Sequence, residues 1–191
     1  MTGPVSATPV IAVIIGSTRP GRKGDAVGHW VIEQASRRTD ATFELLDLLD
    51  VALPALDEVV PPAAGRYSQT HTQSWAHTVA GFDGYVFVTP EYNHGYPGSL
   101  KNALDRVYAE WNHKAAGFVS YGADGGLRAV EQLRQVIATL KLAGVGPQVA
   151  LNMREDFTNY TDFMPRAHQA QSLAALLDDI VCWSTALRSR T

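Results

Sequence analysis

The stretch "VIAVIIGSTRPGRKG", Val10 to Gly24, joins an apolar run to a loop that is rich in glycine and basic residues. Val10–Ile15 is a nearly continuous β-branched run, which is typical of a strand buried on both faces of a parallel sheet. The loop Gly16–Gly24 contains three glycines, one proline and three basic side chains. Because backbone N–H groups at a helix start bind anions, this loop predicts a phosphate site, although a basic surface turn that only joins strand to helix would have a similar composition.

Outward from this stretch, strand and helix patterns alternate along the whole chain. Further strands are expected at Thr42–Leu48, at Tyr85–Thr89, from Ala115 to near Ser120, and at Gln148–Met153. Helices are expected from a cap at Asp25 to about Arg37, at Thr70–Ala80, from a cap at Ser99, at Leu127–Leu142 and at Pro165–Leu187. This alternation predicts an α/β fold, in which a flavodoxin-like, doubly wound, parallel five-stranded sheet of order 2-1-3-4-5 carries helices on both faces.

The composition is that of one ordinary globular domain. The 191 residues are 46% hydrophobic and 18% charged, and the net charge of −3 is too mild to suggest nucleic acid or a membrane surface as partner. We expect residues 1–9 to form a disordered lead-in without a signal peptide, and residues 10–191 to form a single domain. Cys182 is the one cysteine, so an intrachain disulfide is excluded, and a cytoplasmic location is expected because disulfides are rare in that reducing compartment. We expect Cys182 to be a buried thiol on a helix.

The spacing within the loop excludes several known phosphate-binding motifs. A nucleotide-triphosphate P-loop ends in Lys followed by Ser or Thr, whereas Arg22 and Lys23 stand in those positions here. Ser17-Thr18 interrupts the G-x-G-x-x-G motif of dinucleotide-binding folds. The loop has no cysteine to act as a phosphatase nucleophile, and no carboxylate cluster suggests Mg²⁺. The loop therefore predicts a monophosphate held without a metal, as in flavin mononucleotide (FMN).

Two later segments carry the features expected around a flat ring. In "TPEYNHGYPGSLKNALD", Thr89 to Asp105, proline ends a strand, and glycines allow close backbone approach beside the aromatic rings of Tyr92 and Tyr96. The segment "SYGADGG", Ser120 to Gly126, follows the next strand of the predicted sheet. Because ligands bind beyond the carboxyl ends of such strands, these two segments predict a cradle for a polar heterocycle.

These three segments resemble the signature segments of the NAD(P)H-dependent FMN reductases, which include quinone, chromate and azo-dye reductases. The resemblance runs from about Val10 to Met153 and implies FMN as bound cofactor and NAD(P)H as co-substrate. It implies a phosphate site at Ser17, Thr18, Arg19, Arg22, Lys23 and Gly24. It implies contacts to the isoalloxazine from Pro90, Glu91, Tyr92 and Asn93, and to its pyrimidine side from Ser120, Tyr121 and Gly122.

The resemblance also implies the reaction. A nicotinamide gives a hydride to N5 of FMN and leaves, and a small acceptor such as a quinone, free flavin, azo compound or metal oxyanion then takes the electrons in a ping-pong cycle. Because the chemistry takes place on the cofactor, no catalytic side chain and no metal site is expected. A homodimer or a homotetramer is implied as well. Two alternatives stay open: a flavin-binding electron carrier or sensor without nicotinamide oxidation of its own, and a flavodoxin-like module used only for protein contacts.

Residues beside these segments have structural interpretations. We expect His94 to be a hydrogen-bonding group of its turn rather than a proton donor. Glu91 is expected to act through its backbone, while its carboxylate could tune the flavin, pair with a neighbouring chain or face solvent. Asp105 and Arg106 are expected on a solvated or subunit-facing helix, and Trp111 in packing.

Overall fold

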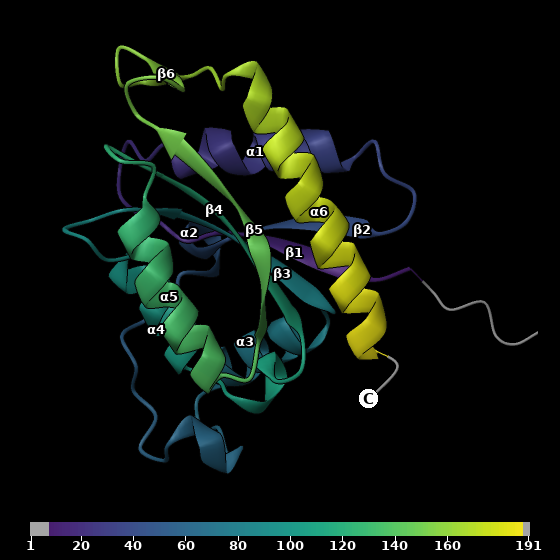
Figure 1. Cartoon of the computed structure of the whole chain (residues 1–191). Helices are drawn as coiled ribbons and strands as arrows, with labels where there is room; N and C mark the ends of the chain where they lie inside the picture. The colour runs from purple at the N-terminus through teal and green to yellow at the C-terminus, as the bar shows by residue number, and fades with distance from the viewer. Residues whose placement is uncertain (1–7, 189–191) are drawn as a thin grey trace, which may run out of the picture.

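The computed structural model describes residues 8–188, which build a parallel five-stranded sheet (Figure 1). Neighbouring strands pair in the order β2-β1-β3-β4-β5, and every one of these pairings is parallel. The strands are β1 (Val10–Ile15), β2 (Thr42–Asp47), β3 (Gly84–Pro90), β4 (Ala115–Gly122) and β5 (Ala143–Asn152). The predicted fold class and strand order are therefore confirmed.

Helices cover both faces of this sheet (Figure 1). One face carries α1 (Gly24–Ala35) and α6 (Ala167–Arg188). The other face carries α3 (Thr70–Ala80), α4 (Gly98–Asp105) and α5 (Leu127–Thr139). The shorter elements are α2 (Leu48–Val51), the 3₁₀ turns η1 (Pro62–Ala64) and η2 (Ala109–Trp111), and a hairpin of β6 (Phe157–Thr158) and β7 (Asp162–Phe163).

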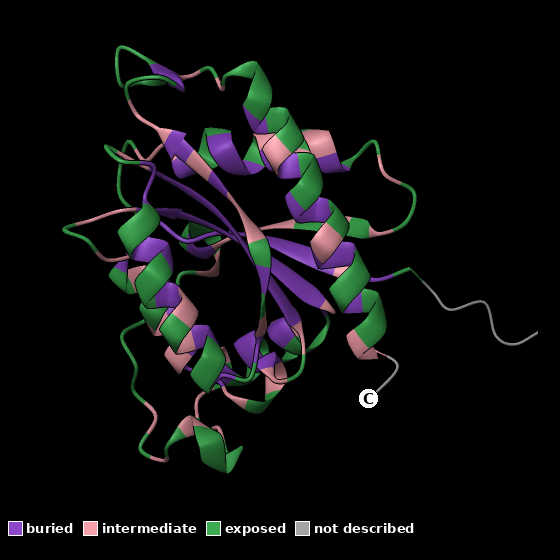
Figure 2. Ribbon diagram, viewed as in Figure 1, coloured by how far each residue is buried: buried purple, intermediate pink, exposed green. Residues whose placement is uncertain are grey.

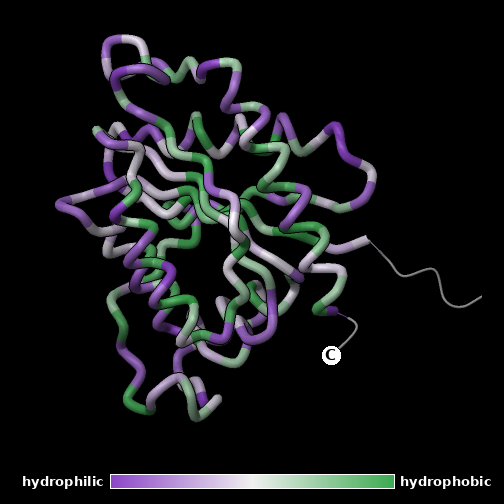
Figure 3. Tube along the Cα trace, viewed as in Figure 1, coloured by the Kyte–Doolittle hydropathy of each residue, from purple (hydrophilic) through white to green (hydrophobic). Residues whose placement is uncertain are grey.

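Each face of the sheet has its own hydrophobic core. Ile11 and Val13 of β1 pack toward α1 and α6, whereas Ala12 and Ile14 pack toward α3, α4 and α5. Because successive side chains of a strand point to opposite faces, a strand covered on both sides requires an uninterrupted apolar run. Figure 2 shows the central strands buried along their length, and Figure 3 shows hydrophilic residues gathered in the peripheral loops.

Two helix caps expected from the sequence are wrong, although the helices themselves are present. Helix α1 begins at Gly24 with Lys23 in the capping position, so Asp25 lies inside its first turn. Helix α4 begins at Gly98, one residue before the expected cap. The hydroxyl of Ser99 donates instead to the carbonyl of Gly16 at 2.6 Å. Ser99 therefore ties the start of α4 to the glycine-rich loop after β1.

Arg106 is fully buried, which contradicts the expected solvated or subunit-facing position. Its guanidinium donates to Asp57 Oδ1 at 3.0 Å, to Thr72 Oγ1 at 3.1 Å and to the carbonyl of Pro54. A buried guanidinium requires such partners because it loses its hydration. Arg106 thereby holds the segment between α2 and α3 against α4.

Other single-residue expectations have mixed outcomes. Trp111 is fully buried and packs edge-on against Trp75 with ring centroids 6.1 Å apart, so its packing role is confirmed. Cys182 is exposed on α6, so the expectation of a buried thiol is wrong. Most of the expected lead-in, residues 1–7, lies outside the described residues, but Pro9 is buried and its carbonyl accepts the N–H of Thr42 at 2.9 Å.

The end of the chain departs most from the expected element boundaries. Strand β5 begins at Ala143, five residues before the expected Gln148, and the β6–β7 hairpin was not predicted. None of the helices within residues 8–188 combines the length and the apolar character needed to cross a membrane.

Gly117 of β4 allows α6 to approach the sheet closely. A Cβ at this position would lie 2.8 Å from Cδ1 of Leu176 and 3.0 Å from Cγ1 of Ile180. We expect Gly117→Ala to lower the free energy of unfolding by about 1–3 kcal/mol, because the added methyl overpacks a filled core. Urea unfolding measures this change. Gly146→Ala is the matched control, since a Cβ there meets nothing within 4 Å; equal stability of the two variants would contradict the close approach.

Candidate functional site

The three loops singled out in the sequence meet at one edge of the sheet. They follow β1, β3 and β4, which are neighbours in the sheet. The backbone connects them directly, because Gly16 N–H donates to the carbonyl of Val88 at 2.9 Å and Glu91 N–H donates to the carbonyl of Tyr121 at 3.0 Å. The parallel ladder therefore continues past the strand ends and holds the bases of the loops side by side.

The loop after β1 is closed on itself by Arg22. Its guanidinium forms an ion pair with Asp47 at the end of β2 and donates to the carbonyl of Ser17 at 3.2 Å. The hydroxyl of Ser17 is buried and shares a 2.7 Å hydrogen bond with the hydroxyl of Tyr92. Arg22 and Ser17 thus have partners within the protein, and these contacts hold the loop in place.

The start of α1 has backbone donors without a side-chain cap. The side chain of Lys23, the capping residue, makes no hydrogen bond to the helix start, and Val27 N–H donates to the carbonyl of Lys23 at 3.3 Å. The first N–H groups of a helix need partners from outside it. Asp25 cannot supply such a cap from within the first turn, so this helix start suits an anion, such as a phosphate.

A cavity of about 220 Å³ lies between the loops. It brings together seven of the expected site residues: Arg19, Lys23, Pro90, Glu91, Tyr92, Tyr121 and Gly122. Three further lining residues were not predicted: Ala123, Met153 and Tyr160. The cavity combines cationic side chains with aromatic rings, which matches the two parts of a flavin phosphate.

The remaining expected residues lie outside this cavity. Thr18 and Arg22 border a shallow groove on the outer side of the loop, which Arg19 also lines. Ser120 is fully buried, and its hydroxyl donates to the carbonyl of Gly125 at 2.6 Å, so its side chain is engaged outside the cavity. Asn93 is exposed in a turn in which it and His94 have positive φ angles of 50° and 67°.

Gly24 and Tyr121 fit together at the floor of the site. The hydroxyl of Tyr121 is buried beside the backbone N–H of Gly24, and a Cβ on Gly24 would lie 2.9 Å from it. Burial raises the pKa of the Tyr121 phenol well above its ordinary value. Glycine at position 24 therefore allows the ring of Tyr121 to reach the helix start, where it presents a neutral hydroxyl.

Glu91 has its carboxylate engaged within the same chain. It accepts the N–H of Arg128 at 3.0 Å and pairs with the Arg128 guanidinium at 2.9 Å, and that guanidinium also binds Asp124 at 2.9 Å. The carboxylate therefore caps the start of α5, and the interpretation in which it faces solvent is wrong. Its charge is compensated beside the cavity.

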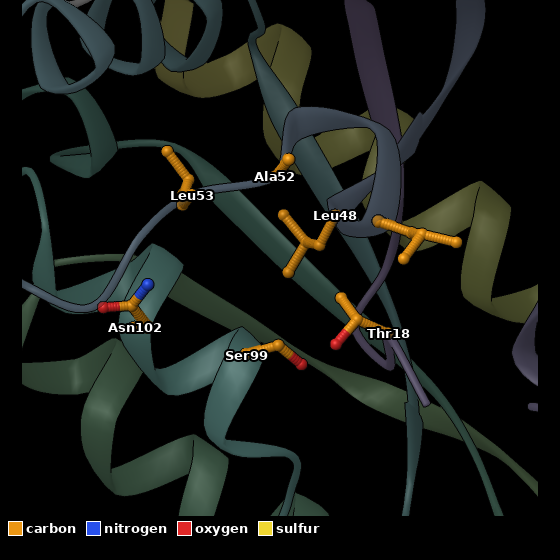
Figure 4. A pocket seen from close by; sticks show the side chains of 7 residues that line it. Thr18, Leu48, Ala52, Leu53, Ser99 and Asn102 are labelled. Atoms are coloured by element: carbon orange, nitrogen blue, oxygen red, sulfur yellow. The ribbon is translucent and has the colours of Figure 1, made fainter. Parts of the chain in front are cut away.

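A second pocket of about 270 Å³ lies on the other side of the glycine-rich loop (Figure 4). Its lining is mainly apolar, from Leu48, Leu49, Ala52 and Leu53, with Thr18, Ser99 and Asn102 as polar members. Asn102 donates to the carbonyl of Pro54 at 2.7 Å and Ser99 to that of Gly16, so these groups already have partners. The residues that line this pocket are uncharged, whereas Arg19, Lys23 and Glu91 line the cavity between the loops.

Residues 9–156 match the family described as NADPH-dependent FMN reductase. The chain belongs to the NADPH-dependent FMN reductase family. The resemblance stated from the three segments is thereby confirmed, and with it an oxidoreductase that uses FMN and NAD(P)H. Among residues 8–188, no group of three or more His, Cys, Asp or Glu side chains is arranged to hold a metal ion.

Relatives of this FMN reductase come from fungi and bacteria. It is 44% identical to an NAD(P)H-dependent FMN reductase of Schizosaccharomyces pombe over 151 residues, which cover 78% of this chain and 76% of the relative. It is 31% identical to a quinone reductase of Escherichia coli over 138 residues, covering 68% of this chain and 70% of that protein. Among solved structures, this chain is similar to FerB, a flavoenzyme NAD(P)H:(acceptor) oxidoreductase from Paracoccus denitrificans. The two structures superimpose with a TM-score of 0.73 at 20% identity, over 94% of this chain and 98% of FerB. This likeness shows that the two proteins share a fold.

The capping role of Glu91 in this FMN reductase can be measured apart from activity. We expect Glu91→Ala to lower the free energy of unfolding by about 1–2 kcal/mol, because α5 loses its acceptor and Arg128 loses a charged partner. Chemical denaturation gives the value. Glu131→Ala is the control on the same helix, since Glu131 is exposed; a Glu91 variant as stable as this control would show that the cap contributes nothing.

Proposed function

We propose that this chain transfers a hydride from NAD(P)H to an FMN held between the three loops, and that the electrons then pass to a small acceptor in a ping-pong cycle. The acceptor classes are quinones, free flavins, azo compounds and metal oxyanions. FMN supplies the hydride uptake and release when it is bound. The observation that carries the proposal is the cavity that joins Arg19 and Lys23 to the aromatic rings of Tyr92 and Tyr121.

We assign the phosphate to the glycine-rich loop because of how its charges are compensated. Asp47 neutralises Arg22, whereas neither Arg19 nor Lys23 has an ion pair among residues 8–188. The guanidinium of Arg19 lies over the ring of Tyr92, 5.7 Å from its centroid. Arg19 and the uncapped start of α1 would therefore bind the phosphate, while Ser17, Thr18, Arg22, Lys23 and Gly24 form the loop around it.

We assign the isoalloxazine to the segments Pro90–Asn93 and Ser120–Gly122. At Gly122 a Cβ would lie 3.2 Å from the backbone nitrogen of Gly126 and 3.3 Å from Cβ of Glu91, so a side chain there would crowd these two residues. The carboxylate of Glu91 faces Arg128, which keeps an uncompensated negative charge away from an electron-rich reduced ring. The protein thereby orients the ring and limits repulsion without a proton-transferring side chain.

We further propose a homodimer or a homotetramer and a cytoplasmic location. The assembly is supported by apolar side chains exposed on the segment between α2 and α3, where Leu56 is 46% and Val59 93% exposed. The location is supported by the single cysteine, since a reducing compartment does not favour disulfides. Sedimentation velocity of the purified chain measures the assembly.

The proposed reaction makes a direct spectroscopic prediction. The purified chain, supplied with FMN, is expected to be yellow, and NADH or NADPH under nitrogen is expected to bleach it rapidly, because hydride uptake removes the oxidised flavin absorbance. Air or a quinone then restores the colour. Slow bleaching by both nicotinamides, with fast reduction by a partner reductase, would support the electron-carrier alternative; a chain that takes up no FMN would contradict both.

Arg19 is the side chain whose loss tests the phosphate assignment. We expect Arg19→Ala to weaken FMN binding by about 1.5–3 kcal/mol, roughly tenfold to over a hundredfold in Kd, because a charged hydrogen bond to phosphate is lost. Titration of the apoprotein with FMN, followed by flavin fluorescence, measures the affinity. Arg37→Ala is the control, since Arg37 is exposed beyond the far end of α1; unchanged affinity in both variants would mean that the phosphate binds elsewhere.

A further inference from the structure

The β6–β7 hairpin places an aromatic side chain beside the proposed flavin site. Phe157 pairs with Phe163 and Thr158 with Asp162, which leaves Asn159, Tyr160 and Thr161 in the connecting turn. In Figure 1 the hairpin stands beyond the end of β5, near the start of α1. Tyr160 lines the cavity together with Arg19, Lys23, Tyr121 and Met153.

The base of the hairpin is firmly held. Asp156 is fully buried and accepts the N–H groups of Asn152 at 2.8 Å and Arg166 at 3.0 Å and the side-chain amide of Gln169 at 3.1 Å. Phe157 contacts Tyr121, with ring centroids 6.2 Å apart. Phe163 packs edge-on against Trp30 of α1 at 5.5 Å. A turn on such a base keeps its position relative to the cavity.

The turn itself is an unfavourable place for tyrosine. Asn159 and Tyr160 have φ angles of 53° and 57°, and Thr161 N–H donates to the carbonyl of Thr158 at 3.0 Å, as in a type I′ turn. Glycine is the preferred second residue of that turn, because a side chain is strained at positive φ. Tyr160 is also 60% exposed, so burial of its ring does not offset the strain. Strain of this kind is typical of functional positions.

We propose that Tyr160 is a specificity-determining residue, whose ring forms the outer wall against which a planar aromatic acceptor packs. The inference rests on the proposed function and adds to it the shape of the preferred acceptor. A flat quinone stacks on a phenol ring, whereas a compact inorganic oxidant such as ferricyanide has no flat face to offer. The chain therefore favours planar organic acceptors through a residue outside the three signature segments.

The test compares Tyr160→Gly and Tyr160→Phe with the wild-type holoprotein. Gly adopts the positive φ without strain, so the Gly variant is expected to keep or raise the melting temperature. For the planar probe menadione, the Gly variant is expected to raise KM about threefold to tenfold with kcat nearly unchanged, because an aromatic stacking contact is lost. KM for ferricyanide is expected to stay the same, and the Phe variant is expected to behave as wild type.

Binding without turnover provides a second measurement. Menadione titrated into the oxidised holoprotein, without reductant, is expected to show the same rise in Kd for Tyr160→Gly. Lys141→Gly is the matched control, since Lys141 is another exposed residue with a positive φ, 55°, and does not line the cavity. The Lys141→Gly substitution relieves backbone strain outside the cavity and is expected to leave the preference for menadione over ferricyanide unchanged.

Three outcomes would overturn the proposal. The first is a Gly variant that binds FMN but keeps the wild-type preference for menadione over ferricyanide. The second is a Gly variant in which the Kd for FMN rises by the same factor as that for menadione, because Tyr160 would then act on the cofactor. The third is a wild-type chain that binds no FMN, which overturns the proposed function as well. FMN binding by the wild-type chain therefore distinguishes a failure of this proposal alone from a failure of the proposed function.

Discussion

The parallel pairing of β1 with β3 and of β3 with β4 is the constraint on which the site depends. These pairings bring the carboxyl ends of three strands to one edge, and the bonds from Gly16 to Val88 and from Glu91 to Tyr121 extend the ladder into the loops. Main-chain hydrogen bonds cannot shift by one residue without turning every buried side chain to the opposite face. The two cores thus fix where the loops begin, and the loops fix the cavity.

Charge compensation then decides which polar groups face the cavity. Asp47 engages Arg22, Arg128 engages Glu91, and Asp57 engages the buried Arg106. Each pair satisfies a charge that would otherwise have to remain solvated. Arg19 and Lys23 keep no such partner within residues 8–188, so the uncompensated charge of the loop lies where the phosphate is proposed. The carboxylate of Glu91 can likewise lie beside the proposed flavin because the guanidinium of Arg128 binds it.

Backbone conformations that favour glycine gather around the same edge of the sheet. Gly126 has a φ of 73°, and a Cβ there would lie 3.0 Å from the backbone nitrogen of Tyr121. Asn93, His94, Asn159 and Tyr160 adopt positive φ without being glycine. Such positions reduce stability, and the firmly packed base of each loop compensates for them. Of these four side chains, Tyr160 lines the cavity, whereas His113 and Lys141 have positive φ angles away from it.

The sequence by itself determined the layers of the fold and the family, because the β-branched run of β1, the strand–helix alternation and the three loop segments are local patterns. The strand order predicted that the three loops meet at one edge, and the resemblance of these segments to the FMN reductases implied seven of the residues that line the cavity. Only the tertiary structure distinguished Arg19 from Arg22, which have the same side chain in the same loop. Asp47 stands beside Ile15 in the β1–β2 pairing and binds Arg22 from 25 residues away. Only the tertiary structure brought Tyr160 to the site, because the position of the hairpin depends on the buried contacts of Asp156 and Phe157. Local patterns describe what a residue can do, but its partners are decided by which distant segments the packed sheet brings within reach.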